Sequence, residues 1–117
     1  MIKSCKHLEV YQEGYRLAIE IYQLANNLPA EAYELVKQLK RSSISIPLNI
    51  AEGYGKKESV AEFKRYLRMS VGSANEIEVL LEMLKDLKYF DEETYQRYIE
   101  AYTVLGKRLN VLLNKWK

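Results

Sequence analysis

Apolar residues recur at three- and four-residue steps along most of the chain, which is the period of one face of an α-helix. Four segments show this period, and none alternates with a period of two over a length that would suggest a strand. The first helix is expected from about His7 to Asn27, and it ends within the sequence "NNLP". One apolar stripe is formed by Tyr11, Tyr15, Ala18, Ile19, Tyr22 and Ala25. A second stripe beside it is formed by Val10, Leu17, Ile21, Leu24 and Leu28.

The second helix is expected to begin near Pro29, because proline suits a first helical turn, where its missing N–H would be unpaired anyway. It runs toward Gly53 and Gly55, which should release the chain into a loop. Pro47 lies inside this segment, where it removes a backbone donor and its ring crowds the carbonyl of Ser43. We therefore expect a helix that is kinked at Pro47 or divided there into two abutting pieces.

The third and fourth helices are marked by their first residues. Ser59 with Glu62 three residues later has the pattern of a capping box, which predicts a helix that extends to about Leu87. Asp91 is the expected N-cap of the fourth helix. Gly72 lies in the middle of the third helix, where glycine costs about 1 kcal/mol relative to alanine. Close packing against another helix is the expected reason for it.

The predicted fold class is all-α, an antiparallel up-down-up-down four-helix bundle. Connections of a few residues between helices favour antiparallel neighbours. A length of 117 residues with 48% apolar residues indicates a single domain, 1–117, with a core of its own. One cysteine, Cys5, excludes an internal disulfide. The chain contains no signal-peptide pattern and no apolar run long enough to cross a membrane, so we expect a cytoplasmic protein without membrane contact.

Some helices carry more apolar residues than one buried stripe needs. Val79 and Met83 fall outside the main arc of the third helix, and Val104 and Val111 lie nearly opposite the Tyr/Leu face of the fourth. Single exposed apolar residues are common, and this alternative stays open for Val104 and Val111. The set as a whole favours a subunit interface.

Residue types needed for catalysis are scarce. His7 is the only histidine and Cys5 the only cysteine, whereas a structural zinc site needs about four such ligands and a di-iron bundle needs two Glu-x-x-His pairs. The segment "GYGKKES" lacks the spacing of a phosphate-binding Walker loop. We therefore expect a non-enzymatic protein with no catalytic residue, metal or cofactor.

Polar residues interrupt the apolar segment around Pro47. Ser45, Asn49 and Glu52 share one face of the second helix. A buried carboxylate can serve as a base, but no second acid or nucleophile is placed near Glu52 by the sequence. Arg41 is eleven residues away from Glu52 and is no local partner. We interpret Arg41, Ser45, Asn49 and Glu52 as a structural polar network whose partner comes from another helix.

Charge is distributed unevenly although the net charge is only +2. Residues 37–68 hold eight Lys or Arg and three Glu, residues 69–100 hold three basic and eight acidic residues, and residues 101–117 hold four basic residues and no acidic one. The candidate nucleic-acid-binding residues are Lys56, Lys57, Lys64, Arg65, Arg68, Arg97, Arg108 and Lys115. The last three align along the expected outer face of the fourth helix.

Three interpretations of these basic residues remain. The basic end of one subunit meets the acidic end of the next, and a head-to-tail contact of this type closes into a ring. Alternatively the basic residues face the phosphates of RNA or DNA, with a strong dependence on salt. The third alternative is a solvated basic face without a partner.

Longer motifs resemble a known family. The segment "RSSISIPLNIAEGYGKKESVAEFKRYLRMSVGSANEIEVLL", the upstream segment "LEVYQEGYRLAIEIYQLANNLP" and the later "LKYFDEETYQRY" are similar to the bacterial four-helix-bundle family, also called the 23S ribosomal RNA intervening-sequence protein family. The similarity covers nearly the whole chain. Ser42 stands where relatives more often have a second arginine, which weakens the case for a basic pair at positions 41 and 42.

The resemblance implies the bundle fold and a ring-shaped homo-oligomer, a pentamer. A distant relative, the accessory variability determinant of diversity-generating retroelements, resembles a basic ring that binds nucleic acid and a reverse transcriptase. From these points we expect an oligomeric nucleic-acid-binding accessory protein with RNA as the preferred ligand, and a protein partner such as a reverse transcriptase. The alternative is a protein-interaction scaffold with no nucleic-acid role.

Overall fold

The computed structural model describes residues 5–117, and within this range it consists of helices and contains no strand. The α-helices are α1 (Glu9–Ala25), α2 (Tyr33–Tyr54), α3 (Val60–Asp86) and α4 (Glu92–Lys115). Two short 3-10 turns precede α1 and α2, namely η1 (Cys5–His7) and η2 (Ala30–Ala32).

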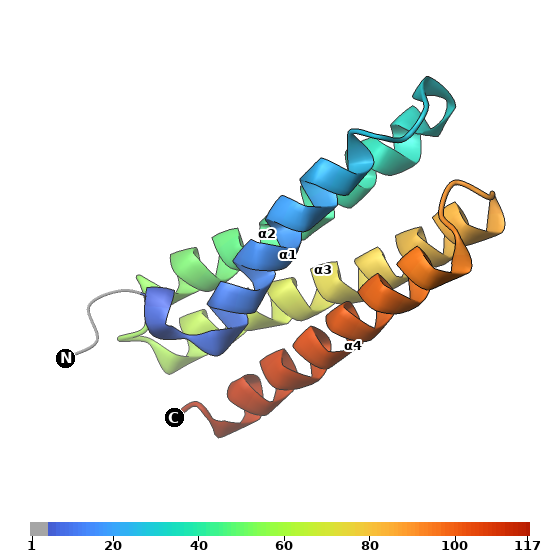
Figure 1. Cartoon of the computed structure of the whole chain (residues 1–117). Coiled ribbons are helices and arrows are strands. Elements are labelled where there is room, and N and C mark those ends of the chain that lie inside the picture. The colour runs from blue at the N-terminus through green and yellow to red at the C-terminus, as the bar shows by residue number, and fades with distance from the viewer. Residues whose placement is uncertain (1–4) are drawn as a thin grey trace.

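The helices run alternately up and down along an elongated molecule of 45 × 20 × 20 Å, and short turns join them at its two ends (Figure 1). Each helix packs closely against the next one along the chain, whereas α1 and α4 touch only lightly. The predicted all-α, antiparallel up-down-up-down bundle is confirmed. The α1–α4 side forms an open seam.

The core consists of one apolar stripe from each helix, and the stripes meet along the bundle axis. The largest fully buried side chains are Leu17, Ile21, Leu39, Ile46, Ile50, Phe63, Leu67, Ile77, Leu81, Leu84, Tyr102 and Leu105. Within each helix they recur at steps of three, four, seven or ten residues, as expected from the period of an amphipathic helix. Burial of these stripes stabilises the bundle through the hydrophobic effect.

Two predicted helix caps are present. Ser59 Oγ accepts a hydrogen bond of 3.2 Å from the backbone N–H of Glu62 and so begins α3. Asp91 Oδ1 accepts one of 2.7 Å from the N–H of Thr94 at the start of α4. The Thr94 N–H bond lowers the pKa of Asp91, because it stabilises the charged carboxylate.

Helix α2 continues without a break through Pro47, so a division into two abutting pieces is wrong. A bend at this residue stays a prediction. Nearby serines bond to backbone carbonyls one turn earlier: Ser43 Oγ donates to Lys40 O at 2.8 Å, and Ser45 Oγ donates to Ser42 O at 2.7 Å. Side-chain bonds of this kind compete with the regular ladder and accompany helix bending.

Two glycines differ from their expected roles. Gly53 lies inside α2 and is buried, and a Cβ placed on it would lie 2.6 Å from Tyr66 Cβ of α3. Gly53 therefore allows close approach of two helices, and the helix ends only after Tyr54. Gly72, for which close packing was expected, has no atom within 4 Å of such a Cβ. Within one copy that expectation is wrong, because Gly72 faces outward.

Candidate nucleic-acid interface

A cluster of basic residues occupies the end of the molecule where α2 passes into α3. Its members are Lys56, Lys57, Lys64, Arg65 and Arg68. The short turn between Tyr54 and Val60 and the first turns of α3 bring them to one end. The cluster lies at the same end as both termini of the described chain (Figure 1).

Lys56 is held by a tyrosine. Its Nζ donates a hydrogen bond of 2.9 Å to Tyr66 Oη and lies 3.9 Å from Glu52 Oε2. Tyr66 Oη in turn donates to Glu52 Oε2 at 3.1 Å. The bond to Tyr66 raises the pKa of Lys56, because it favours the ammonium form. The ammonium group of Lys56 is thus held in place beside Tyr66, and Glu52 offsets part of its charge.

Arg65 is paired within its own helix. Its Nε and Nη2 donate to the two carboxylate oxygens of Glu62 at 3.0 and 3.3 Å, and its guanidinium lies 4.5 Å from the centre of the Tyr66 ring. The Arg65 bonds lower the pKa of Glu62. A bidentate pair of this kind occupies the donor face that a phosphate would use.

Three cations of the cluster keep uncompensated charge. Lys57 Nζ lies 4.5 Å above the Tyr54 ring, an attraction that leaves its charge free for a further anion. Lys64 and Arg68 form no ion pair or hydrogen bond with any residue in the range 5–117. Glu58 in the same turn is exposed and forms no ion pair with any of these three cations. Lys57, Lys64 and Arg68 are the strongest candidates for phosphate contacts.

The candidate basic residues of α4 are spread along this helix, with Arg97 near its start and Arg108 and Lys115 in its second half. Arg97 Nη2 lies 3.4 Å from Glu20 Oε1, and Arg108 Nη1 pairs with Glu13 Oε1. Both glutamates belong to α1, so the two arginines bridge the open seam and their charge is offset there. Arg97 and Arg108 thus share one side of α4, but this side faces α1, so the two arginines do not form the free outward stripe that was expected.

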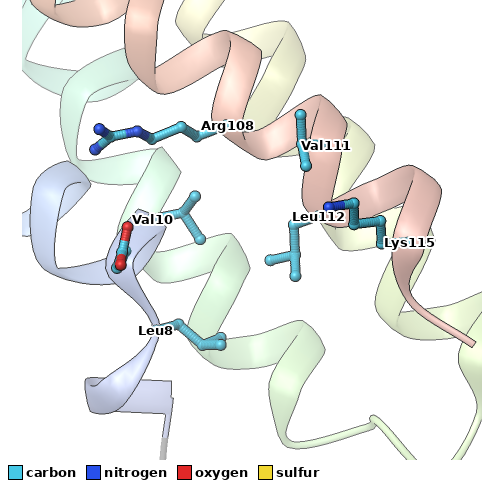
Figure 2. Close-up of a pocket in the computed structure, with 7 residues that line it drawn as sticks. Leu8, Val10, Arg108, Val111, Leu112 and Lys115 are labelled. Carbon is cyan, nitrogen blue, oxygen red and sulfur yellow. The ribbon is translucent and has the colours of Figure 1, made fainter.

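Lys115 lines an apolar groove between the start of α1 and the end of α4, at the end of the bundle that carries both termini of the described chain. The groove has a volume of about 290 Å³. Its lining residues are Leu8, Glu9, Val10, Arg108, Val111, Leu112 and Lys115. Figure 2 shows Leu8 and Val10 facing Val111 and Leu112 of α4, with the guanidinium of Arg108 reaching across toward α1. This groove differs from the basic cluster because most of its lining side chains are apolar.

The predicted polar network is only partly formed. Ser45 Oγ bonds to Ser73 Oγ of α3, whereas Asn49 Nδ2 donates to the Ser45 carbonyl of its own helix at 2.8 Å. Glu52 meets α3 through Tyr66, but its side chain is 58% exposed and thus no buried carboxylate. Arg41 Nε donates to Gln38 Oε1 at 3.2 Å and is exposed, and within the described chain it forms no hydrogen bond with the other three residues.

Sequence reasoning missed the α3 side of this network. Ser42 Oγ donates to Glu76 Oε1, and Ser70 Oγ donates to the Ile46 carbonyl at 3.0 Å. A signal was available, since polar residues three apart in α2 oppose polar residues three apart in α3, Ser73 and Glu76. Antiparallel helices with equal polar spacing bring both pairs together.

Within residues 5–117, no group of three or more His, Cys, Asp or Glu side chains is placed to hold a metal ion. His7 packs edge-on against Tyr54, with 5.6 Å between ring centres. No helix of the described chain has the length and apolar character required to cross a membrane.

Comparison with known proteins identifies the family. The sequence profile described as "23S rRNA-intervening sequence protein" matches residues 6–111. The chain belongs to this family. Among proteins with curated functions, none matches the chain.

A solved structure supports the same assignment to the 23S rRNA-intervening sequence proteins. The crystal structure of a protein of unknown function from the S23 ribosomal protein family of Bacteroides thetaiotaomicron superimposes with a TM-score of 0.83 at 30% sequence identity. The alignment covers 91% of this chain and 96% of that one. The resemblance noted from the sequence motifs is confirmed over nearly the full length of both proteins.

Proposed function

We propose that this protein is a non-enzymatic, ring-forming helical bundle of the cytoplasm that binds nucleic acid, and RNA in particular, as an accessory protein. One observation carries the proposal: Lys57, Lys64 and Arg68 hold uncompensated positive charge at one end of the bundle. The family description names 23S rRNA, and this is why we choose a structured RNA as the ligand.

Assembly multiplies a modest charge. In a ring with rotational symmetry, every copy presents the same end of its bundle on the same face. The cluster of Lys57, Lys64 and Arg68 then recurs around that face. Each phosphate contact releases condensed counterions, so affinity falls steeply as salt rises.

The test is a mobility-shift titration with a structured RNA at low and high salt. The double variant Lys57→Gln/Lys64→Gln removes two of the uncompensated charges. We expect weaker binding and a salt slope that is smaller by about 2 for each subunit in contact with the RNA, since each lost phosphate contact removes roughly one unit. The control is Lys88→Gln/Lys107→Gln, which removes equal charge from exposed positions outside the cluster.

Equal losses in both double variants would show that only total charge matters and would contradict a site at this end. The absence of any shift by the unchanged protein at low salt would remove the RNA-binding proposal altogether.

The alternative function, a protein-interaction scaffold, is favoured by a second feature. An apolar groove of about 300 Å³ lies between α1 and α2. It is lined by Tyr11, Tyr15, Ala18, Ile19, Ile44, Pro47, Leu48 and Ala51. If the protein is such a scaffold, a protein partner such as a reverse transcriptase would cover this groove. In that case the mobility-shift titration would show no RNA binding.

A further inference from the structure

The groove between α1 and α2 is unusually exposed for its apolar character. Leu48 is 61% exposed, Tyr15 54% and Ile19 47%. Ile44, Pro47 and Ala51 form the rest of its α2 wall. Contiguous exposed apolar surface of this kind marks an interaction site.

A second apolar face runs along the outside of α3. Met69, Val79 and Met83 are 45%, 59% and 44% exposed. They lie on one stripe with Gly72, because steps of three, seven and four residues return to the same side of a helix. Gly72 leaves a bare site on this stripe, since nothing lies within 4 Å of the position a Cβ would take. A side chain from outside has room there.

Hydrogen bonds between α2 and α3 fix which residues lie at the same height along the bundle. Ser45 bonds to Ser73, and the Ile46 carbonyl bonds to Ser70. Because the two helices are antiparallel, Gly72 lies about level with the α2 segment between Ile44 and Leu48. Leu48, the most exposed residue of the groove, and the bare site at Gly72 on α3 thus lie at about the same height along the bundle axis.

Charge follows the same heights. Lys37 and Arg41 continue the outer stripe of α2 toward the α1–α2 turn, and the bond from Ser42 to Glu76 sets Arg41 level with Glu76. Lys37 is then about level with Glu82 on α3. Neither Lys37 nor Glu82 forms an ion pair within the part of the chain that the structure describes.

We propose that the α1–α2 groove of one copy receives the outer face of α3 of a second copy, with the two bundles parallel and level. Leu48 then packs at Gly72, while Lys37 meets Glu82 and Arg41 meets Glu76. This inference specifies the subunit contact of the ring proposed above and rests on that assembly. The two surfaces differ, so the contact is heterologous and repeats from copy to copy.

The opposite orientation is disfavoured by charge. If the second bundle were inverted, the half of α2 with Lys37 and Arg41 would face the basic start of α3, which contains Lys64, Arg65 and Arg68. Like charges placed together across an interface cost free energy and exclude the wrong arrangement. The charge pattern therefore selects the parallel contact.

Disulfide trapping tests the contact without any RNA. In a Cys5→Ser background, one protein carries Leu48→Cys and another carries Gly72→Cys. They are mixed under reducing conditions, left to exchange subunits and then oxidised. We expect a covalent dimer in the mixture and none from either protein alone. A chain with both substitutions should give a ladder whose longest band counts the subunits.

The control replaces Gly72→Cys by Val104→Cys, an exposed apolar position on α4, and should give no dimer. Lys37→Glu in the Leu48→Cys chain should reduce the yield of dimer, and Glu82→Lys in the Gly72→Cys chain should restore it. Circular dichroism checks that each variant remains helical.

Dimer formation by either single-cysteine protein alone would show that like surfaces meet and would overturn the proposal. An unchanged monomer band in the mixture would overturn it as well. Since trapping uses no nucleic acid, a failure of RNA binding leaves this result intact, and a failure of trapping leaves RNA binding to its own test.

Discussion

At the scale of single residues, the hydroxyl of Tyr102 is the atom least suited to its place. The side chain is fully buried, and its oxygen has no hydrogen-bond partner among residues 5–117. Burial raises the pKa of Tyr102, because the charged phenolate would lose its hydration. A buried hydroxyl without a partner costs about 1–3 kcal/mol.

Tyr102→Phe should therefore increase the free energy of unfolding by about 1 kcal/mol, measured by urea denaturation. Tyr98→Phe is the matched control, because Tyr98 donates a hydrogen bond of 3.0 Å to Glu20 and its loss should destabilise the protein. A decrease in stability for Tyr102→Phe would mean that its hydroxyl has a partner, such as an ordered water.

The raised pKa of Tyr102 also leads us to expect that the free energy of unfolding depends on pH. The unfolded chain releases this proton near the ordinary tyrosine pKa of about 10, whereas the folded protein retains it to higher pH. The unfolded state then binds fewer protons, so stability falls as pH rises above about 10. Tyr102→Phe should show a smaller fall between about pH 9 and about pH 11 in urea denaturation. An equal fall in both proteins would assign the loss to other groups.

At the scale of helices, two buried glycines should respond in opposite ways to the same substitution. Gly53→Ala places a Cβ 2.6 Å from Tyr66 Cβ, whereas Gly106→Ala places one 3.9 Å from Ala74 Cβ, an ordinary contact. We expect Gly53→Ala to lower the free energy of unfolding by about 1–3 kcal/mol through overpacking. Gly106→Ala should raise it by about 1 kcal/mol through helix propensity.

Thermal unfolding followed by circular dichroism measures both variants. Similar gains from the two substitutions would show that α2 and α3 separate easily at Gly53 and that the close approach contributes little to stability.

The helices themselves were predictable because their signals are local. The cap at Ser59 depends on a residue three positions away, and the apolar stripes follow from spacing alone. The role of Gly53 was not predictable, since it depends on Tyr66 of another helix. The same holds for Arg41, whose distance from Glu52 along the chain did not reveal that it bonds to Gln38 and faces solvent.

At the scale of the whole molecule, the ring proposed here predicts that stability depends on protein concentration. Association favours the folded state by mass action. Each tenfold increase in protein concentration should stabilise the assembled state by about 1 kcal/mol per subunit, so the melting temperature should rise. Scanning calorimetry over a hundredfold range is the measurement, and a melting temperature independent of concentration would contradict the assembly.

The distribution of charge shows where sequence reasoning about the site reached its limit. The basic cluster at Lys57 and Lys64 was predictable because its members are close along the chain. The pairing of Arg97 with Glu20 and of Arg108 with Glu13 was not, since 77 and 95 residues separate the partners. Only the packed bundle shows that these two arginines bridge helices.

The light contact between α1 and α4 bears on how the chain folds. Nearly all tight packing joins helices that are consecutive in the sequence, which gives a low contact order and favours rapid folding. Three helices can already associate during synthesis while the fourth is still in the ribosomal exit tunnel. The last helix then docks onto a preformed surface, and the long-range closure between the two ends of the chain is left as a minor final step.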